Sequence, residues 1–202
     1  MWIPVAVDAE RSNSESFDTV TIIFDSARYL PDNVSASKLD ARLYNPKRNN
    51  YSSHCSIASK IVLDTPVYFP VFETVMLIPA RDITIFSVVV VTLSTCDRFT
   101  GVTVIIGTVC IPLCIDDGRD NNELQISTGA YQLPILVNLP TREAMNDRDA
   151  LSQLPRVPCA SLLFRVFDSD SNRISILSSK CSWRRIQDWK VYFRTVQRTN
   201  NI

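Results

Sequence analysis

VVVVTLSTCDRFTGVTVIIGTVCIPL, residues Val88–Leu113, consists of an apolar run, a polar loop with one aspartate, and a second apolar run. β-Branched residues dominate both runs, which predicts two strands joined by a loop. The first apolar run begins upstream, at Ile83, so we expect a strand over Ile83–Leu93. Because that run does not alternate with polar residues, the strand is expected to be central and covered on both faces.

Turn signals divide the rest of the chain into further short strands. Pro134 within one of them indicates an edge strand, and Pro140–Pro158 is a long polar connection with a helical turn expected around Arg142–Ala150. Eight short strands separated by turns predict an all-β fold, an eight-stranded antiparallel sandwich. The other expected strands are Val20–Phe24, Leu39–Tyr44, Cys55–Leu63, Val71–Ile78, Val102–Ile111, Tyr131–Val137 and Ala160–Phe167.

The C-terminal stretch Ser182–Arg198 differs from the rest in its periodicity. Its apolar residues recur at helical spacing, with Ser182 as a possible N-cap, although a strand through Trp189, Val191 and Phe193 is the alternative. We therefore expect three parts. Residues 1–17 form an N-terminal arm, 18–168 the sandwich, and 169–202 an extension made of a polar turn and an amphipathic helix.

Composition narrows the possible functions and locations. The 202 residues carry 21 basic and 21 acidic side chains, so no global field favours nucleic acid or an anionic membrane. The six cysteines form no Cys-x-x-Cys motif, and buried free thiols in a reducing compartment are the expectation. The N-terminus has no signal-peptide pattern, and the run Ile83–Leu93 is too short for a membrane helix. A cytoplasmic protein is expected.

The sequence does not favour an enzyme, because the residue types that common catalytic motifs need are missing. His54 is the only histidine, and nothing in its neighbourhood forms a nucleophile motif. With four glycines in the chain, neither a P-loop nor a dinucleotide-binding loop is present. We expect a protein that is not an enzyme and binds no cofactor, nucleic acid or small-molecule substrate.

Five passages, taken in order, resemble the C2 domain family. Val20–Pro31 is similar to its opening strand followed by "Ala-Arg-x-Leu-Pro", and Val88–Leu113 to its third-loop region with "Ile-Gly" and a final "Pro-Leu". Because the opening motif comes first and the closing strand last, the order resembles the second, circularly permuted topology of the family. The remaining three passages are Thr65–Ile78, Tyr131–Leu136 and Ala160–Phe167.

The resemblance implies a calcium site that is degenerate in this chain. Family members hold calcium with aspartates from two loops, and hard cations need several charged oxygen ligands. Only Asp32 in the first loop and Asp97 in the third remain. The family's paired aspartate falls on Thr95, and a first-loop ligand falls near Ser37 or Lys38. We therefore expect no metal site, and calcium-independent function.

The resemblance also implies an interaction role, as a structural adaptor or subunit of a larger assembly, with cytoskeletal and ciliary assemblies as the candidates. Edge strands and the basic, aromatic C-terminal stretch are the expected partner surfaces. The alternative is calcium-independent binding to anionic membranes through this stretch and the loop tips Tyr29 and Phe99. The stretch can equally pack on its own sandwich, and its expected contact residues are Trp183, Arg184, Arg185, Ile186, Trp189, Lys190, Phe193 and Arg194.

Overall fold

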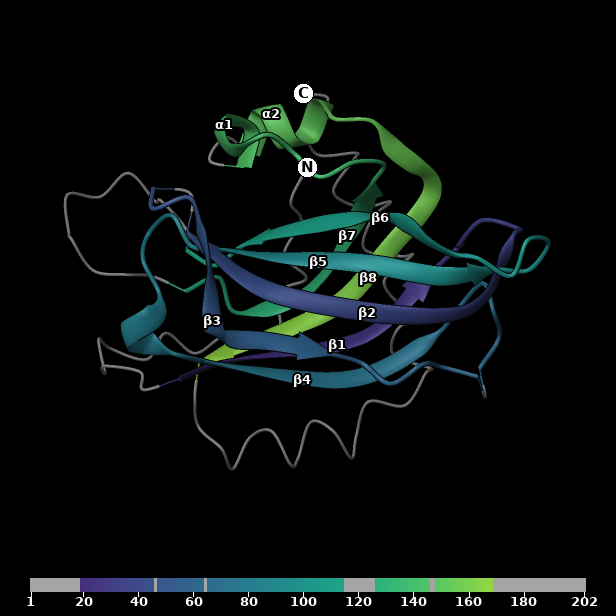
Figure 1. The fold of residues 1–202 in the computed structure, drawn as a ribbon. Helices are drawn as coiled ribbons and strands as arrows, with labels where there is room; N and C mark the ends of the chain where they lie inside the picture. Colours follow the sequence, from purple (N-terminus) through teal and green to yellow (C-terminus); the bar gives the residue numbers. More distant parts are fainter. Residues whose placement is uncertain (1–18, 46, 64, 115–125, 146–147, 169–202) are drawn as a thin grey trace, which may run out of the picture.

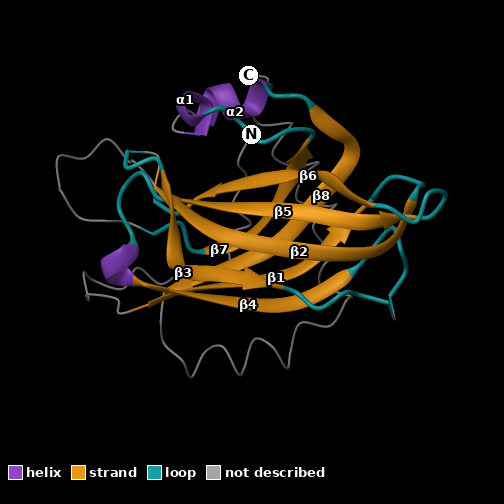
Figure 2. Ribbon diagram, in the orientation of Figure 1, coloured by secondary structure: helices purple, strands orange, loops and turns teal. Residues whose placement is uncertain are grey.

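The computed structural model describes residues 19–45, 47–63, 65–114, 126–145 and 148–168. Within these ranges the chain forms eight strands, two short α-helices and one 3-10 turn, so the predicted all-β class is confirmed (Figure 2). None of the described helices is long and apolar enough to cross a membrane. The elements are β1 (Thr19–Arg28), β2 (Val34–Asn45), β3 (Asn50–Ala58), β4 (Val71–Pro79), η1 (Ala80–Asp82), β5 (Val88–Asp97), β6 (Thr103–Pro112), β7 (Gly129–Leu136), α1 (Arg142–Met145), α2 (Arg148–Gln153) and β8 (Arg156–Asp168).

The strands form two antiparallel halves that lie one in front of the other (Figure 1). The order is β3-β2-β5-β6-β7-β8-β1-β4, and the two halves join where β6 meets β7. That junction consists of a single pair, Thr108 with Leu136, whereas the pairs β2–β5, β5–β6 and β1–β8 extend over most of each strand. The fold is therefore a two-layer sandwich held together mainly by its core.

Alternating apolar residues supply the core between the layers. On β2, Leu39, Ala41 and Leu43 are buried, as their alternation with polar neighbours predicts. The opposite layer contributes Phe24 and Phe164, whose ring centroids lie 6.5 Å apart. Burial of this kind is the main stabilising term of the fold.

The prediction that β5 begins at Ile83 is wrong, because the strand starts at Val88. The preceding residues form turns: Ile83 N–H donates to the carbonyl of Ala80 at 3.0 Å, and Ser87 N–H to that of Thr84 at 2.9 Å. Apolar composition alone did not distinguish these turn residues from the strand. β5 also extends further than expected, to Asp97.

The central position predicted for β5 is confirmed, since it lies between β2 and β6. Val89 and Val91 belong to the core between the layers, whereas Val88 and Val90 belong to a second cluster that includes Met145 of α1. Leu151 of α2 completes this cover. The connection between β7 and β8 therefore shields the outer face of β5, which explains why the strand is apolar on both faces.

Pro134 does not mark an edge in the sheet order, because β7 lies between β6 and β8. Its β8 partner is Ser161, but β6 pairs with β7 only at Leu136. At Pro134 the side of β7 facing β6 thus carries no ladder, and a residue without an amide N–H is tolerated there.

Candidate functional site

Two neighbouring loops, Tyr29–Asn33 and Asp97–Val102, meet at one end of the sandwich. The side-chain amide of Asn33 donates to the Asp97 carboxylate at 2.6 Å, although the two residues are 64 positions apart. In return, the backbone N–H of Arg98 donates to the carbonyl of Asn33 at 2.9 Å. These contacts fix the relative positions of the two loops that the sequence singled out.

The carboxylate of Asp97 accepts several hydrogen bonds from its own loop. Its Oδ1 accepts hydrogen bonds from the backbone N–H groups of Phe99 and Thr100, both at 2.9 Å, and from the Thr100 hydroxyl at 3.1 Å. The Asn33 amide and these donors favour the ionised carboxylate and lower the pKa of Asp97 to about 2. The carboxylate is thus occupied by donors from the protein itself.

The other positions expected for calcium ligands do not gather around Asp97. Thr95 is buried in β5, where its hydroxyl donates to the carbonyl of Ala36 at 2.8 Å. Asp32 is exposed in the first loop. Among the residues that the structure describes, no group of three acidic, histidine or cysteine side chains is placed to hold a metal ion.

The two predicted loop tips are both exposed, but they differ in their surroundings. Tyr29 is 46% exposed and packs edge-to-face on Phe69, with ring centroids 5.2 Å apart. Phe99 is 74% exposed, and the Arg98 guanidinium lies 4.7 Å from its ring centroid. Val102, at the end of the same loop, is also exposed. The β5–β6 hairpin thus presents apolar side chains beside a cationic group.

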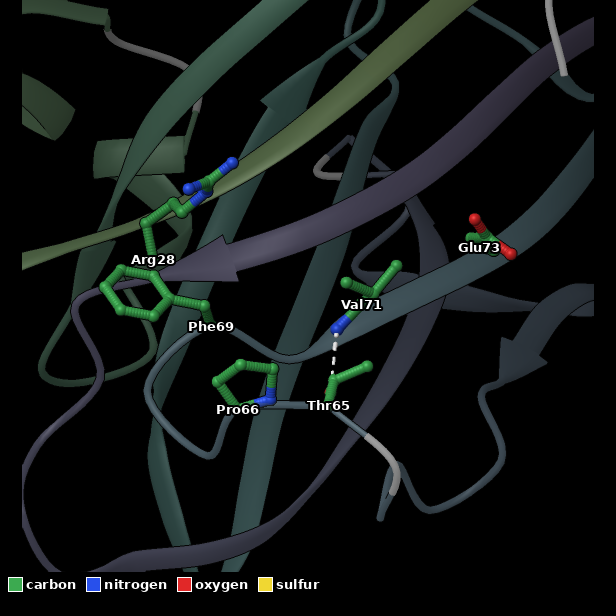
Figure 3. A pocket seen from close by; sticks show the side chains of 6 residues that line it. All are labelled: Arg28, Thr65, Pro66, Phe69, Val71 and Glu73. Atoms are coloured by element: carbon green, nitrogen blue, oxygen red, sulfur yellow. Dashed lines mark hydrogen bonds between the residues drawn. The ribbon is translucent and has the colours of Figure 1, made fainter. Parts of the chain in front are cut away.

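Next to the first loop lies an open pocket of about 590 Å³ that the sequence did not indicate. Figure 3 shows the Arg28 side chain beside the Phe69 ring and the backbone N–H of Val71 bonded to the Thr65 hydroxyl. The guanidinium carbon of Arg28 is 5.7 Å from the centroid of Phe69. The walls are mostly apolar. Its lining residues are Arg28, Thr65, Pro66, Phe69, Val71 and Glu73.

A largely buried ion pair, which the sequence did not indicate, lies on β1 and β8. Arg165 donates from both Nε, at 2.9 Å, and Nη2 to the carboxylate of Asp25. Burial raises the pKa of Asp25, and the hydrogen bond from Arg165 opposes that shift. Asp25 sits where the register of β1 shifts against both neighbouring strands. A charged residue inside the apolar run of β1 was the signal that could have revealed it.

The histidine and the cysteines singled out in the sequence form no common site within the described ranges. His54 is exposed on β3, and the five cysteines within the described ranges form no disulfide with one another. The C-terminal partner-binding residues, Trp183 to Arg194, lie outside the described residues, so their predicted role remains a prediction.

No family model matches the sequence, and no curated protein matches it. Similar solved structures include PLC21 from S. officinalis, at 18% identity over 77% of this chain and 16% of that one, with a TM-score of 0.46. CC2D1B is 11% identical over 82% of this chain and 61% of that one, with a TM-score of 0.47. Human GIVD cytosolic phospholipase A2 is 12% identical over 77% of this chain and 16% of that one, with a TM-score of 0.42. The chain thus spans 16% of PLC21 and 61% of CC2D1B, and TM-scores below 0.5 assign it to no family.

Proposed function

We propose that this chain is a C2-like, calcium-independent protein-interaction module without catalytic activity, which serves as an adaptor or subunit of a larger assembly. The observation that carries the proposal is the apolar surface of the β5–β6 hairpin, where Phe99, Val102 and Ile105 are 74%, 58% and 68% exposed. Several large apolar side chains exposed on one hairpin are typical of surfaces that bind a partner.

Calcium independence is supported by the occupied carboxylate of Asp97. A cation at this end would have to displace the Asn33 amide and the backbone N–H groups of Phe99 and Thr100. It would gain few charged oxygens in exchange, because Thr95 supplies a hydroxyl that is already bonded to Ala36. Millimolar calcium is therefore expected to leave the melting temperature unchanged, whereas a large rise would contradict this part of the proposal.

The adaptor role is tested by capture from native lysate with three forms of the whole chain: unaltered, truncated after Asp168, and carrying Phe99→Ser. We expect a stoichiometric protein partner that is reduced by Phe99→Ser or by loss of the tail. A matched control is Ile85→Ser, since Ile85 is similarly exposed (61%) but lies in the turn before β5. Capture of lipid alone would overturn the adaptor role.

A second candidate, binding to anionic membranes, is favoured by one specific observation. Tyr29 and Phe99 project from two loops that are bonded to each other, and the cationic Arg98 lies beside Phe99. Sedimentation with phosphatidylserine vesicles tests it. Pelleting that is lost in Phe99→Asp, or after changing Arg184, Arg185 and Lys190 to Glu, supports the membrane. No pelleting leaves the adaptor role as the working proposal.

A further inference from the structure

We propose that the open N-terminal half of β6, residues Thr103–Ile106, binds an extended peptide segment of a partner protein as an added strand, with acidic residues of that segment facing Arg98. This inference rests on the proposed function and names the surface and the chemistry of the partner.

β6 is paired along its length on one side only. Its ladder with β5 runs from Thr103 opposite Cys96 to Pro112 opposite Val88, with one register shift at Ile106, which has no partner on β5. On its other side, the single pair to the rest of the described sheet is Thr108 with Leu136. In the part of the chain that the structure describes, residues 103–106 therefore have no ladder partner on this side.

The hydrogen-bond alternation shows which backbone groups are open. Asp97 N–H donates to the carbonyl of Val102 at 2.9 Å, so this pair is hydrogen-bonded. In an antiparallel ladder bonded and non-bonded pairs alternate, and the next pair, Cys96 with Thr103, is non-bonded. The N–H and C=O groups of Thr103, and two residues later of Ile105, thus point away from β5. Those groups are available to an added strand.

The other edges of the two layers carry features that discourage pairing. β4 contains the charged Glu73 in a left-handed conformation (φ 44) and ends at Pro79. β7 has Pro134 along its side facing β6. β3 presents mainly polar side chains, with the sequence NYSSHCSIA. Residues 103–106, by contrast, are Thr-Val-Ile-Ile, four β-branched residues without a charge or a proline. The register shift against β5 lies at Ile106, the inner end of this stretch, and leaves Thr103–Ile105 in regular register.

The charge of Arg98 indicates which residues flank the apolar part of the bound peptide segment. Arg98 is exposed in the turn that precedes this edge, and no carboxylate of the described residues lies within ion-pair distance of it. The neighbouring Asp97 carboxylate is already held by Asn33 and by its own loop. A strand added beside Thr103 and Ile105 extends past the turn, where an aspartate or glutamate meets Arg98.

Two fluorescent probe peptides test the inference, Asp-Glu-Val-Thr-Val-Thr-Val-Glu-Asp and the same core flanked by lysines. We expect fluorescence anisotropy to show saturable binding of the acidic peptide to the whole chain and weaker binding of the lysine peptide. Ile105→Pro removes an outward N–H without touching the β5 ladder, and should weaken binding roughly fivefold to tenfold. Ile105→Lys should weaken it too, whereas Leu77→Lys, on the similarly exposed edge strand β4, should not.

Several results would overturn the inference: no binding of the acidic peptide up to about 1 mM, equal binding of the lysine peptide, or undiminished binding to both Ile105 variants. Slow exchange of the Thr103 and Ile105 amide protons in the free monomer would assign the edge to a segment of this chain. A dimer that Ile105→Pro dissociates would assign it to a second copy. If Ile105→Lys captures the same lysate partner as the unaltered chain, this inference fails while the proposed function stands.

Discussion

The two halves of β6 have similar composition and opposite surroundings. From Gly107 to Ile111 every residue is buried, whereas Thr103 and Ile105 in the first half are exposed. In the second half, β7 approaches at Leu136 and the helices α1 and α2 cover the outer face around Cys110. β-Branched residues therefore specify a strand, while the neighbouring elements decide whether that strand is core or exposed surface.

The closed half depends most strongly on Gly107. A Cβ at this position would lie 2.3 Å from the carbonyl oxygen of Leu136 and 2.6 Å from Cγ2 of Ile135. Since backbone cannot move aside cheaply, we expect Gly107→Ala to lower the free energy of unfolding by about 3 kcal/mol. Urea denaturation followed by circular dichroism measures this. Gly101→Ala is an informative comparison, because nothing lies within 4 Å of its Cβ and only its positive φ of 70° opposes the change. A loss for Gly107→Ala no greater than for Gly101→Ala would contradict the proposed close approach.

The helical cover of the closed half is expected to be the next largest contribution. Leu151→Ala removes a buried side chain of α2 from the cluster with Val90 and Cys110. We expect a loss of about 2 kcal/mol in the free energy of unfolding.

The same variant has a chemical readout, because burial raises the pKa of Cys110 to about 12. The thiolate is the reactive form, so at pH 8 Cys110 should resist iodoacetamide in the unaltered chain and react in Leu151→Ala. Peptide mapping by mass spectrometry locates the label, with the exposed Cys159 as the internal standard. Unchanged protection of Cys110 would show that the helices do not shield it.

Beside the open half of β6, at the end of β5, Asp97 is expected to make a smaller, pH-dependent contribution to the free energy of unfolding. Its pKa in the folded chain, about 2, is below its ordinary value of 3.8. The ionised group therefore stabilises the fold above about pH 4, and this contribution disappears as the pH falls toward 2. Asn33→Ala removes the largest cause and should raise the pKa of Asp97, as measured by NMR titration of its carboxyl carbon. An unchanged pKa would mean that the bond between the two loops does not hold Asp97.

The smallest effect on stability is expected on the exposed side chains of the open half. Ile105→Lys should change the free energy of unfolding by no more than about 0.5 kcal/mol, because Ile105 is 68% exposed. Leu77→Lys on β4 should behave alike. A loss above about 1 kcal/mol for Ile105→Lys alone would show that Ile105 supports the fold, and the contrast between the halves of β6 would be weaker than described.

The sequence predicted which segments form strands more accurately than where each strand begins and ends. Alternation on β2 identified its core residues correctly, and the hairpin Val88–Leu113 appears as β5 and β6. The start of β5 was misplaced by five residues because the turn at Ile83–Ser87 has strand-like composition. The pocket beside Arg28 and the ion pair of Asp25 with Arg165 were not foreseen, since their members come from distant parts of the chain.

The fold class could be predicted from the sequence, because periodicity and turn residues are local properties of the chain. The sequence also shows that few acidic residues remain in the two loops. What those residues do depends on contacts between distant segments: Asp97 bonds to Asn33 across 64 positions, because β2 pairs with β5 and Val34 lies opposite Asp97. The same assembly decided that Gly107 must remain a glycine and that Thr103–Ile106 forms an open edge, because both depend on where β7 ends.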